Sequence, residues 1–221
     1  MPVPSLERRT FLEQARKTYQ ESLTELSDAG QYLTKTRGLS WANANYFRLG
    51  VVESPLPGHE EFLGMLCIPY IAPNGDTLTL RFRRLGDEGP KYRSMHGDTP
   101  RPYNTPALER HSLDFWICEG EPDTWISHQI GLPAVGFGGA NTWKPYFKHI
   151  FAQYRTVYIP CDGDKAGKEF GRSIAKDLPN ARPIDMGTYI DDEGEERSHD
   201  VNSYYLLHGA DETLRKVGYV Y

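Results

Sequence analysis

Apolar positions near the start of the chain recur at helical spacing. They predict an amphipathic helix over residues 5–27, whose buried stripe comprises Leu12, Ala15, Tyr19, Leu23 and Leu26. Ser5 can cap this helix, and the run Asp28-Ala29-Gly30 is expected to end it. Residues 1–30 are therefore interpreted as an N-terminal helical segment that packs on the body of the protein.

A mixed pattern follows in residues 31–110. A helix is expected over residues 40–47, and two strands are expected over 63–71 and 77–85. The turn Pro73-Asn74-Gly75-Asp76 between these strands is a hairpin signal. Prolines in residues 99–106 then predict an extended connector. We expect a small α+β lobe here.

Short apolar runs alternate with helical patterns after residue 112. The expected strands cover 115–118, 134–137, 156–161 and 181–185, and the expected helices cover 122–130, 143–151 and 165–178. Such alternation predicts an α/β subdomain over residues 111–221, in which helices flank a largely parallel sheet.

Acidic residues follow two of these strands directly. Glu119 comes after the run that ends at Cys118, and Asp162 and Asp164 come after the run that ends at Cys161. The carboxyl ends of parallel strands open on one crevice, so these carboxylates should face one another. Two unit charges about 4 Å apart interact by roughly 4 kcal/mol at an effective dielectric near 20, so a cation is needed. Oxygen ligands suit Mg²⁺ or Mn²⁺, which predicts a metal-dependent phosphoryl-transfer site.

The order of these motifs resembles the Toprim domain, which bacterial-type primases, topoisomerases and certain nucleases share. Glu119 matches the acidic residue at that family's first strand end, and Asp162 and Asp164 match its paired aspartates. Asp200 and Asn202 stand where the primases carry Asp-Pro-Asp, which implies Asp200 as a metal ligand and Asn202 as a supporting, weak one.

The resemblance also bears on the roles of single residues. It implies that Asp123 helps to hold the site, although an acid in a first helical turn is favourable in itself. Glu119 is expected to bind metal or to act as a general base toward the attacking 3′-hydroxyl. N-capping is the alternative for Asp162 and Asp164, but the matching acids favour metal ligation. A second ion would arrive with the triphosphate, giving a two-metal arrangement.

Upstream motifs are similar to the RNA-polymerase domain of bacterial-type DNA primases. The landmarks in order are Arg37-Gly38-Leu39-Ser40, Phe47-Arg48-Leu49-Gly50, Ile68-Pro69-Tyr70, Arg83-Arg84-Leu85-Gly86, Pro90-Lys91-Tyr92 and the glycine turn 136–140. The similarity spans about residues 30–210. It implies that Arg83, Arg84 and Lys91 contact template or nucleotide. Alternate strand residues face opposite sides, so Arg81 and Arg83 share a face and Arg84 takes the other. Arg83 and Lys91 are the first candidates.

Charge agrees with this interpretation once the chain is divided. The formal net charge is −5, but residues 1–118 carry 14 basic and 14 acidic residues, so the excess belongs to residues 119–221. Residues 81–110 hold seven Lys or Arg against four acids, among them Asp87. A basic segment beside an acidic metal site suits a template and a triphosphate. Lys165 is either a phosphate contact or a solvated first-turn lysine.

Cysteine spacing and hydropathy narrow the class further. Cys67, Cys118 and Cys161 show no Cys-x-x-Cys spacing, so their positions predict no zinc site. Each of them is expected to be a buried thiol. No signal peptide or membrane span is evident, and a cytoplasmic protein is expected. The family's zinc-binding and helicase-binding domains have no counterpart here. A separate zinc-binding subunit or a replicative helicase is thus an expected partner, and a phage genome an expected source.

The predicted function is that of a DNA primase core. Such an enzyme joins ribonucleoside triphosphates into short RNA primers on single-stranded DNA, with Mg²⁺ or Mn²⁺. The alternatives are a Toprim-type nuclease that uses the same carboxylates and a non-catalytic, nucleic-acid-binding primase subunit.

Overall fold

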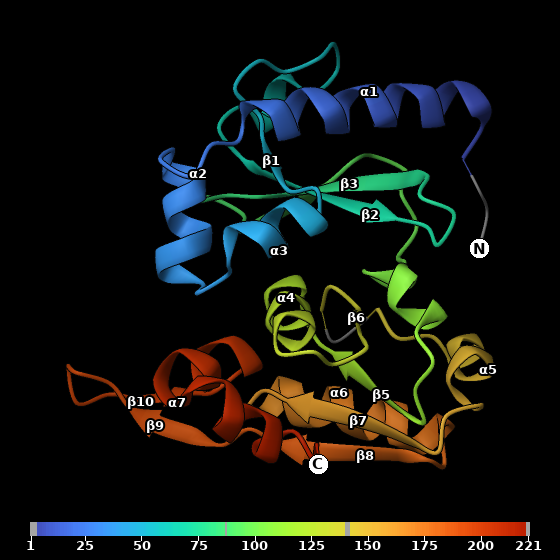
Figure 1. The fold of residues 1–221 in the computed structure, drawn as a ribbon, viewed down its shortest axis with the longest axis vertical. Helices are drawn as coiled ribbons and strands as arrows, with labels where there is room; N and C mark the ends of the chain where they lie inside the picture. Colours follow the sequence, from blue (N-terminus) through green and yellow to red (C-terminus); the bar gives the residue numbers. More distant parts are fainter. Residues whose placement is uncertain (1–3, 87, 140–141, 220–221) are drawn as a thin grey trace. The chain divides into compact units, whose positions relative to one another are not determined.

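The computed structural model describes residues 4–86, 88–139 and 142–219 (Figure 1). Asp87 and Ala140, the last residue of the glycine turn, lie outside the described residues. The chain forms two compact units. Unit 1 comprises Met1–Thr99 with Asn104–Pro106, and unit 2 comprises Pro100–Tyr103 with Ala107–Tyr221.

Unit 1 is built on an antiparallel sheet of order β1-β2-β3-β4. Its strands are Gly50–Val51, Leu66–Ile71, Thr77–Arg83 and Tyr92–Ser94. Its helices are α1 (Leu6–Ser22), α2 (Asp28–Gln31), the π-helical η1 (Tyr32–Thr36), α3 (Trp41–Tyr46) and the short η2 (Glu60–Phe62). Helix α1 lies along the sheet (Figure 1), and Leu12, Ala15 and Tyr19 join the core formed with Phe62 and Phe82.

The N-terminal helix is shorter than predicted. It ends at Ser22, because Leu23 has an extended conformation. Asp28 begins α2 instead of ending α1, since the side chain of Ser27 accepts a hydrogen bond from the Gly30 N–H. A Cβ at Gly30 would overlap the carbonyl of Thr24, which explains the glycine. Leu26 is 87% exposed, so its place in the buried stripe was wrong.

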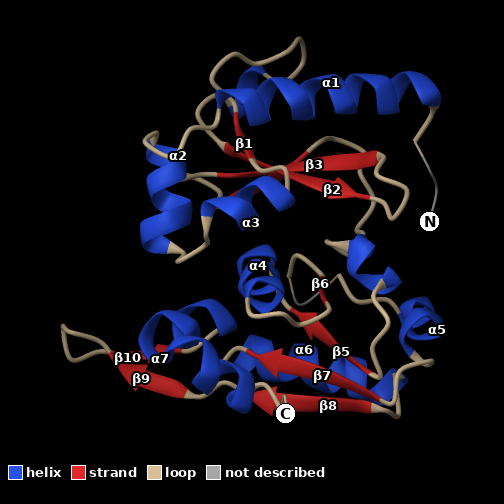
Figure 2. Ribbon diagram, viewed as in Figure 1, coloured by secondary structure: helices blue, strands red, loops and turns tan. Residues whose placement is uncertain are grey.

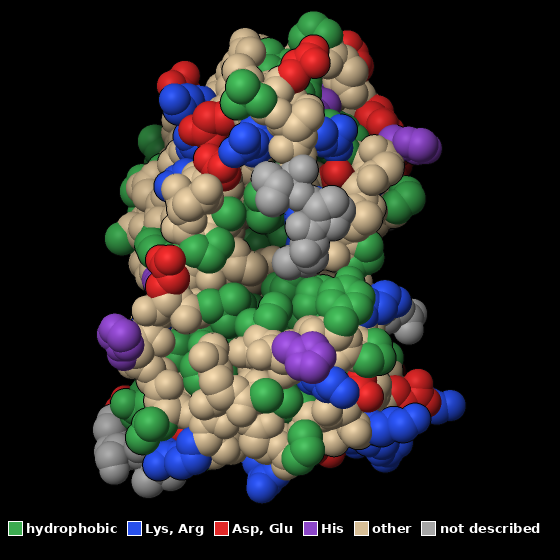
Figure 3. Space-filling view, turned by 90° about the vertical axis from the view of Figure 1, so that its right-hand side faces the viewer, with side chains coloured by type: hydrophobic (Ala, Val, Ile, Leu, Met, Phe, Trp, Pro, Cys, Tyr) green, Lys and Arg blue, Asp and Glu red, His purple; other side chains and the backbone are tan. Residues whose placement is uncertain are grey.

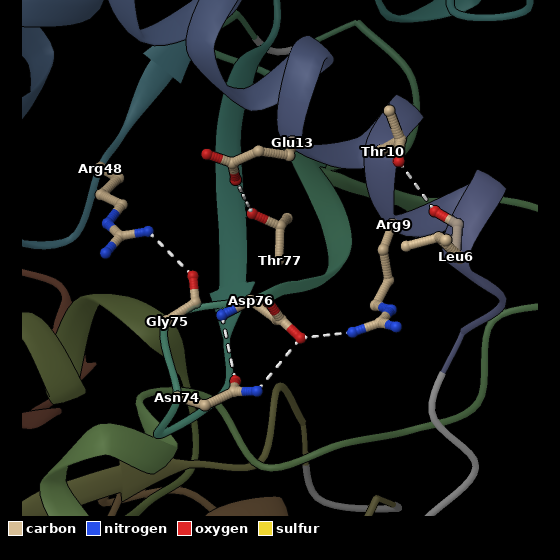
Figure 4. Close-up of polar contacts among 9 residues, drawn as sticks. All are labelled: Leu6, Arg9, Thr10, Glu13, Arg48, Asn74, Gly75, Asp76 and Thr77. Carbon is tan, nitrogen blue, oxygen red and sulfur yellow. Dashed lines mark hydrogen bonds and ion pairs between the residues drawn. The ribbon is translucent and has the colours of Figure 1, made fainter.

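The predicted hairpin of β2 and β3 is confirmed. Side chains from two other segments contact its turn (Figure 4). Arg9 of α1 lies 2.7 Å from the Asp76 carboxylate, and Arg48 donates to the carbonyl of Gly75 at 3.1 Å. Glu13 accepts a hydrogen bond from the Thr77 hydroxyl at 2.7 Å. The contacts of Arg9 and Glu13 bind α1 to the hairpin, and that of Arg48 holds the turn from another segment.

Unit 2 contains the predicted parallel sheet, in the order β6-β5-β7-β8. Its strands are β5 (Asp114–Cys118), β6 (Ala134–Gly136), β7 (Thr156–Cys161) and β8 (Ala181–Asp185). The helices are η3 (Thr105–Glu109, which begins in unit 1), α4 (Glu121–Gln129), η4 (Pro145–Phe147), α5 (Lys148–Phe151), α6 (Lys165–Asp177) and α7 (Val201–Lys216), and β9 (Thr188–Ile190) pairs with β10 (Glu196–Ser198) (Figure 2).

Alternate strand residues build a core on each face of this sheet. Phe115 and Ile117 pack with Phe170 and Ile174 of α6. Trp116 and Cys118 pack on the other face, in a core to which Ile126 of α4 and Val201 and Leu214 of α7 contribute. The α/β architecture is therefore a sheet between two helical layers, and the strand ends between those layers carry the predicted site.

One local prediction differs from the structure. The helix expected over 143–151 is a 3₁₀ turn followed by the four-residue α5, because Pro145 begins the turn. Residues 191–195 form the tip of the β9–β10 hairpin, where Asp191 accepts hydrogen bonds from the N–H groups of Glu193 and Glu195. All three cysteines are free and buried, as predicted. Among the described residues, no helix is both long and apolar enough to cross a membrane.

Candidate active site

Two of the predicted carboxylates, Glu119 and Asp162, lie just beyond one edge of the unit 2 sheet. Strands β5 and β7 are parallel neighbours, with Trp116 opposite Tyr158. Glu119 follows the end of β5 and Asp162 follows the end of β7, so both emerge at the carboxyl edge. This is the edge at which open α/β sheets bind ligands.

Three of the four predicted metal ligands act electrostatically on the fourth, Asp162. Burial first, and then the negative charges of Glu119, Asp200 and Asp164, together raise the pKa of Asp162 to about 8. A carboxylate surrounded in this way resists ionisation, because each neighbour repels the charge that it would carry. The structure thus gathers these four side chains, which come from three separate segments of the chain.

The turn that carries Asp162 and Asp164 is held by close backbone contacts. The Gly163 N–H donates to the carbonyl of His199 at 2.9 Å, and a Cβ at Gly163 would overlap the carbonyl of Gly187. Gly163 is therefore required because the carbonyl of Gly187 approaches it closely. A Cβ at Gly167 would lie 2.5 Å from the Asp162 backbone nitrogen, so the start of α6 packs directly on this turn.

Two of the carboxylates also cap helices. Asp164 Oδ1 accepts from the Gly167 N–H at 2.8 Å at the start of α6. Asp200 Oδ1 accepts from the Ser203 N–H at 2.6 Å, and the Ser203 hydroxyl accepts from the Asp200 N–H in return. Within the described part of the chain, no three His, Cys, Asp or Glu side chains form a group arranged to hold a metal ion as they stand.

Asp123 and Asn202 connect the two helices on one face of the sheet. Asp123 Oδ1 accepts from the backbone N–H of Asn202 at 3.1 Å, which ties the first turn of α4 to the first turn of α7. Both residues are buried. Asp123 thereby fixes the segment that carries Asp200.

His199 is a residue whose place at the site the sequence did not indicate. It is 4% exposed, and its ring stacks on Tyr189 at a centroid distance of 4.4 Å. Burial lowers its pKa, as do the neighbouring His208 and Lys216, while Asp200 opposes them. The only sequence signal is its position directly before Asp200, and spacing alone gave no reason to prefer it over His96 or His111.

The predicted basic residues lie in unit 1, and Arg83 occupies an unexpected environment. Its side chain is 4% exposed, and its guanidinium lies over the rings of Tyr32 and Tyr92, at 5.2 and 4.9 Å from their centroids. It also donates a hydrogen bond to the Tyr92 hydroxyl. Arg81 lies over the same Tyr92 ring at 4.3 Å, which confirms that Arg81 and Arg83 share a face.

The remaining basic candidates are more accessible. Lys91 is exposed and Arg84 is half-buried. Lys165, in unit 2, has a side chain that is 90% exposed and lies 3.9 Å from the Glu169 carboxylate. Basic and acidic side chains are mixed on the face drawn in Figure 3, so binding of a polyanion would depend on local arrangement.

Solved structures define the class to which this fold belongs. The zinc-binding and RNA polymerase domains of the Aquifex aeolicus primase match with a TM-score of 0.75 and 20% identity, over 97% of this chain and 61% of that one. A DnaG primase catalytic domain bound to single-stranded DNA matches with a TM-score of 0.72 and 21% identity, covering 96% and 79%. The RNA polymerase domain of Mycobacterium tuberculosis DnaG matches with a TM-score of 0.73 and 18% identity, covering 96% and 83%. The chain has the fold of the DnaG primase catalytic core.

Sequence comparison gives the family itself. The Gene 57 protein of Mycobacterium phage D29 is 46% identical over 160 residues, which cover 71% of this chain and 99% of that protein. The chain belongs to the family of this phage protein. No family model matches the chain.

Proposed function

We propose that the protein is a DNA primase core that makes short RNA primers on single-stranded DNA from ribonucleoside triphosphates. One observation carries the proposal. In a fold shared with primase catalytic domains, Glu119, Asp164 and Asp200 surround Asp162 closely enough to oppose its ionisation. Perturbed carboxylates gathered at a ligand-binding edge are typical of catalytic sites.

The donor set fits Mg²⁺ or Mn²⁺. Hard cations prefer carboxylate oxygens. Each of the two capping residues bonds its helix through Oδ1, so Oδ2 would be the atom that binds an ion. Glu119, Asp162, Asp164 and Asp200 would hold the ions. When bound, two ions would stabilise the attacking and leaving oxygens of an in-line displacement.

The chain's own residues perform the remaining tasks. Glu119 would bind metal or accept the proton of the attacking 3′-hydroxyl. Asp123 and Asn202 support the site, because their hydrogen bond fixes the start of α7 beside Asp200. Lys165 lies in the first turn of α6, directly after the acidic turn, and is exposed enough to meet a phosphate.

Template binding is assigned to unit 1. A related catalytic domain binds single-stranded DNA, and by analogy the segment with Arg84 and Lys91 would contact the template or nucleotide backbone. Arg83 is enclosed between two tyrosines and would act on the template mainly by fixing Tyr92. A replicative helicase or a zinc-binding subunit would be a further partner, in the cytoplasm of a bacterial host.

De novo synthesis on single-stranded DNA with labelled ribonucleotides, in Mg²⁺ and in Mn²⁺, tests this function. The parent protein should make short RNA, and the variant with Asp162→Ala and Asp164→Ala should make none. Primer synthesis by the double variant would refute the assignment. Metal-dependent nicking of supercoiled plasmid without RNA products would instead indicate a nuclease. If neither occurs, extension of a supplied dinucleotide shows whether only initiation is missing.

A further inference from the structure

We propose that His199 is a positioning residue of the acidic site. Its ring, clamped between β9 and α7, holds the segment before α7 against the turn that carries Asp162 and Asp164. The inference rests on the proposed function where it concerns metal, whereas the clamp itself is a property of the fold.

Backbone hydrogen bonds make His199 the central link between three segments. Its N–H donates to the carbonyl of Gly187, in the connection from β8 to β9, at 2.9 Å. Its carbonyl accepts from the Gly163 N–H, also at 2.9 Å. Gly187, His199 and Gly163 therefore form a continuous chain of contacts, and a shift of His199 must move the Asp162–Asp164 turn or break it.

Aromatic contacts fix the side chain of this link. The His199 ring stacks on Tyr189 with centroids 4.4 Å apart and planes inclined by 29°. It meets the Tyr204 ring edge-on at 5.1 Å, and the His208 ring lies 5.7 Å away. Tyr189 belongs to β9 and Tyr204 to α7, so the ring joins the hairpin to the helix. Such contacts restrain the residue in a way that the two backbone hydrogen bonds alone do not.

A third contact leads to Asp200. His199 Nδ1 lies 3.4 Å from the Ser203 hydroxyl. That hydroxyl accepts from the Asp200 N–H at 2.9 Å, and the Ser203 N–H holds the Asp200 carboxylate at 2.6 Å. The ring therefore borders both the turn with Asp162 and Asp164 and the cap that orients Asp200. Residues that hold metal ligands in position typically contribute ~10–100-fold to metal affinity.

Two substitutions separate the ring's shape from its chemistry. His199→Ala removes the clamp, whereas His199→Phe keeps an aromatic ring of similar size but cannot bond Ser203 or take up a proton. His208→Ala is the matched control, because it removes an exposed imidazole from the outer end of the same aromatic group. The full chain is used throughout. Mn²⁺ affinity is measured by titration, and exchange of the Gly163 amide proton is followed by NMR.

The expected result is a split between the two variants. His199→Ala should lose roughly 10-fold or more in Mn²⁺ affinity, and its Gly163 amide should exchange at least about 10-fold faster, because the hydrogen bond to residue 199 opens more often. His199→Phe and His208→Ala should stay within about threefold of the parent protein in both measurements.

Two outcomes overturn the proposal. In the first, His199→Ala keeps parental Mn²⁺ affinity and slow Gly163 exchange, and only its melting temperature falls, as for an ordinary core residue. In the second, His199→Phe is as impaired as His199→Ala, so that the imidazole and not the clamp matters. Failure of the proposed function would give a result distinct from both of these outcomes. In that case the parent protein and Asp162→Asn would bind Mn²⁺ equally. The exchange comparison alone would in that case decide whether His199 holds the turn.

Discussion

The ion pairs of unit 1 and the acidic site of unit 2 use charge in opposite ways. In unit 1, ionised side chains are matched: Arg8 lies 2.7 Å from Asp98, and Arg16 lies 2.6 Å from Glu13. At the acidic site of unit 2, Glu119, Asp164 and Asp200 act on Asp162 as like charges. The first arrangement lowers the free energy of the folded state, and the second raises it. Unfavourable charge that a fold retains is a feature of functional sites.

The pKa values of two carboxyl groups, Glu13 and Asp162, illustrate this contrast. The hydrogen bond from Arg16, with a further one from Thr77, lowers the pKa of Glu13 to about 2, although burial opposes the shift. Burial and three acidic neighbours raise the pKa of Asp162 to about 8. Glu13 is thus stabilised as a carboxylate at neutral pH, while Asp162 is not. A bound divalent cation would lower the pKa of Asp162, because its positive charge would favour the carboxylate. Glu13 already has a cationic partner in Arg16.

The largest expected effect follows from Asp162→Asn. Primer synthesis should fall by on the order of 1000-fold, because the substitution removes a ligand. Without metal, the same variant should be more stable than the parent at pH 7 by roughly 1–3 kcal/mol, since one pKa unit corresponds to about 1.4 kcal/mol. The raised folded pKa means that the parent loses stability as pH rises from about 4 to about 8. Thermal unfolding in a chelator at pH 4, 7 and 8 measures this gain, which should be smallest at pH 4.

Asp185→Asn is the matched control for this experiment. Asp185 ends β8 in the same sheet, but the N–H of Gly187 and then Lys168 lower the pKa of its carboxyl group. The variant should retain primer synthesis and should gain no stability at pH 7. If Asp162→Asn proves less stable than the parent in chelator at every pH, the acidic group is not repulsive and the contrast between the units fails.

A smaller effect is expected from Arg83→Ala in unit 1. The substitution removes a guanidinium from between two tyrosine rings and a hydrogen bond to the Tyr92 hydroxyl. It should lower the free energy of unfolding by about 2–3 kcal/mol. Lys91→Ala is the comparison, because it removes an exposed cation and should change stability by less than about 0.5 kcal/mol. Urea unfolding followed by tyrosine fluorescence measures both.

Salt dependence of template binding then distinguishes the roles of these two residues. Lys91→Ala should reduce the slope of log affinity against log salt by about 1, as for the loss of one phosphate contact. Arg83→Ala should weaken binding with little change in slope, because Arg83 acts through Tyr92. Equal loss of slope in both variants would show that Arg83 contacts phosphate directly and that its enclosure opens on binding.

Sequence patterns predicted the helices and strands of the fold better than the contacts that individual side chains make. The strands that end at Cys118 and Cys161 were placed at the observed ends, because apolar runs followed by acids mark a strand end in any parallel sheet. The shared face of Arg81 and Arg83 was likewise predictable from strand alternation. The enclosure of Arg83 was not, since Tyr32 lies about fifty residues earlier in a π-helical turn that no periodicity indicates.

For the acidic site too, the sequence predicted the residue types but not their contacts. The types and order of its carboxylates were evident, but the need for glycine at position 163 depends on the carbonyl of Gly187, and His199 depends on rings from β9 and α7. Such contacts join segments that are distant in sequence and carry no spacing signature. They become visible only when the backbone is placed.

The smallest predicted effect concerns His59, which lies in a buried aromatic group of unit 1. Its ring contacts Phe11, Phe62 and Phe82 at centroid distances of 5.1–5.6 Å, and its Nδ1 lies 2.8 Å from the Tyr19 hydroxyl. Burial lowers the pKa of His59, because the imidazolium would lose its hydration. The neutral ring is therefore part of the folded state.

Linkage gives the sign of the pH effect. Below the unfolded value near 6.5, the unfolded chain takes up a proton that the folded chain resists, so stability is lost as pH falls. At pH 5.5 the loss relative to pH 7.5 should be about 1 kcal/mol. His59→Phe, which cannot titrate, should show less acid sensitivity by that amount, whereas His96→Ala, at an exposed position, should match the parent protein. Thermal unfolding of the three proteins at both pH values provides the test. Parallel losses in the parent and His59→Phe would mean that the acid sensitivity between these pH values arises from other groups and not from the buried imidazole.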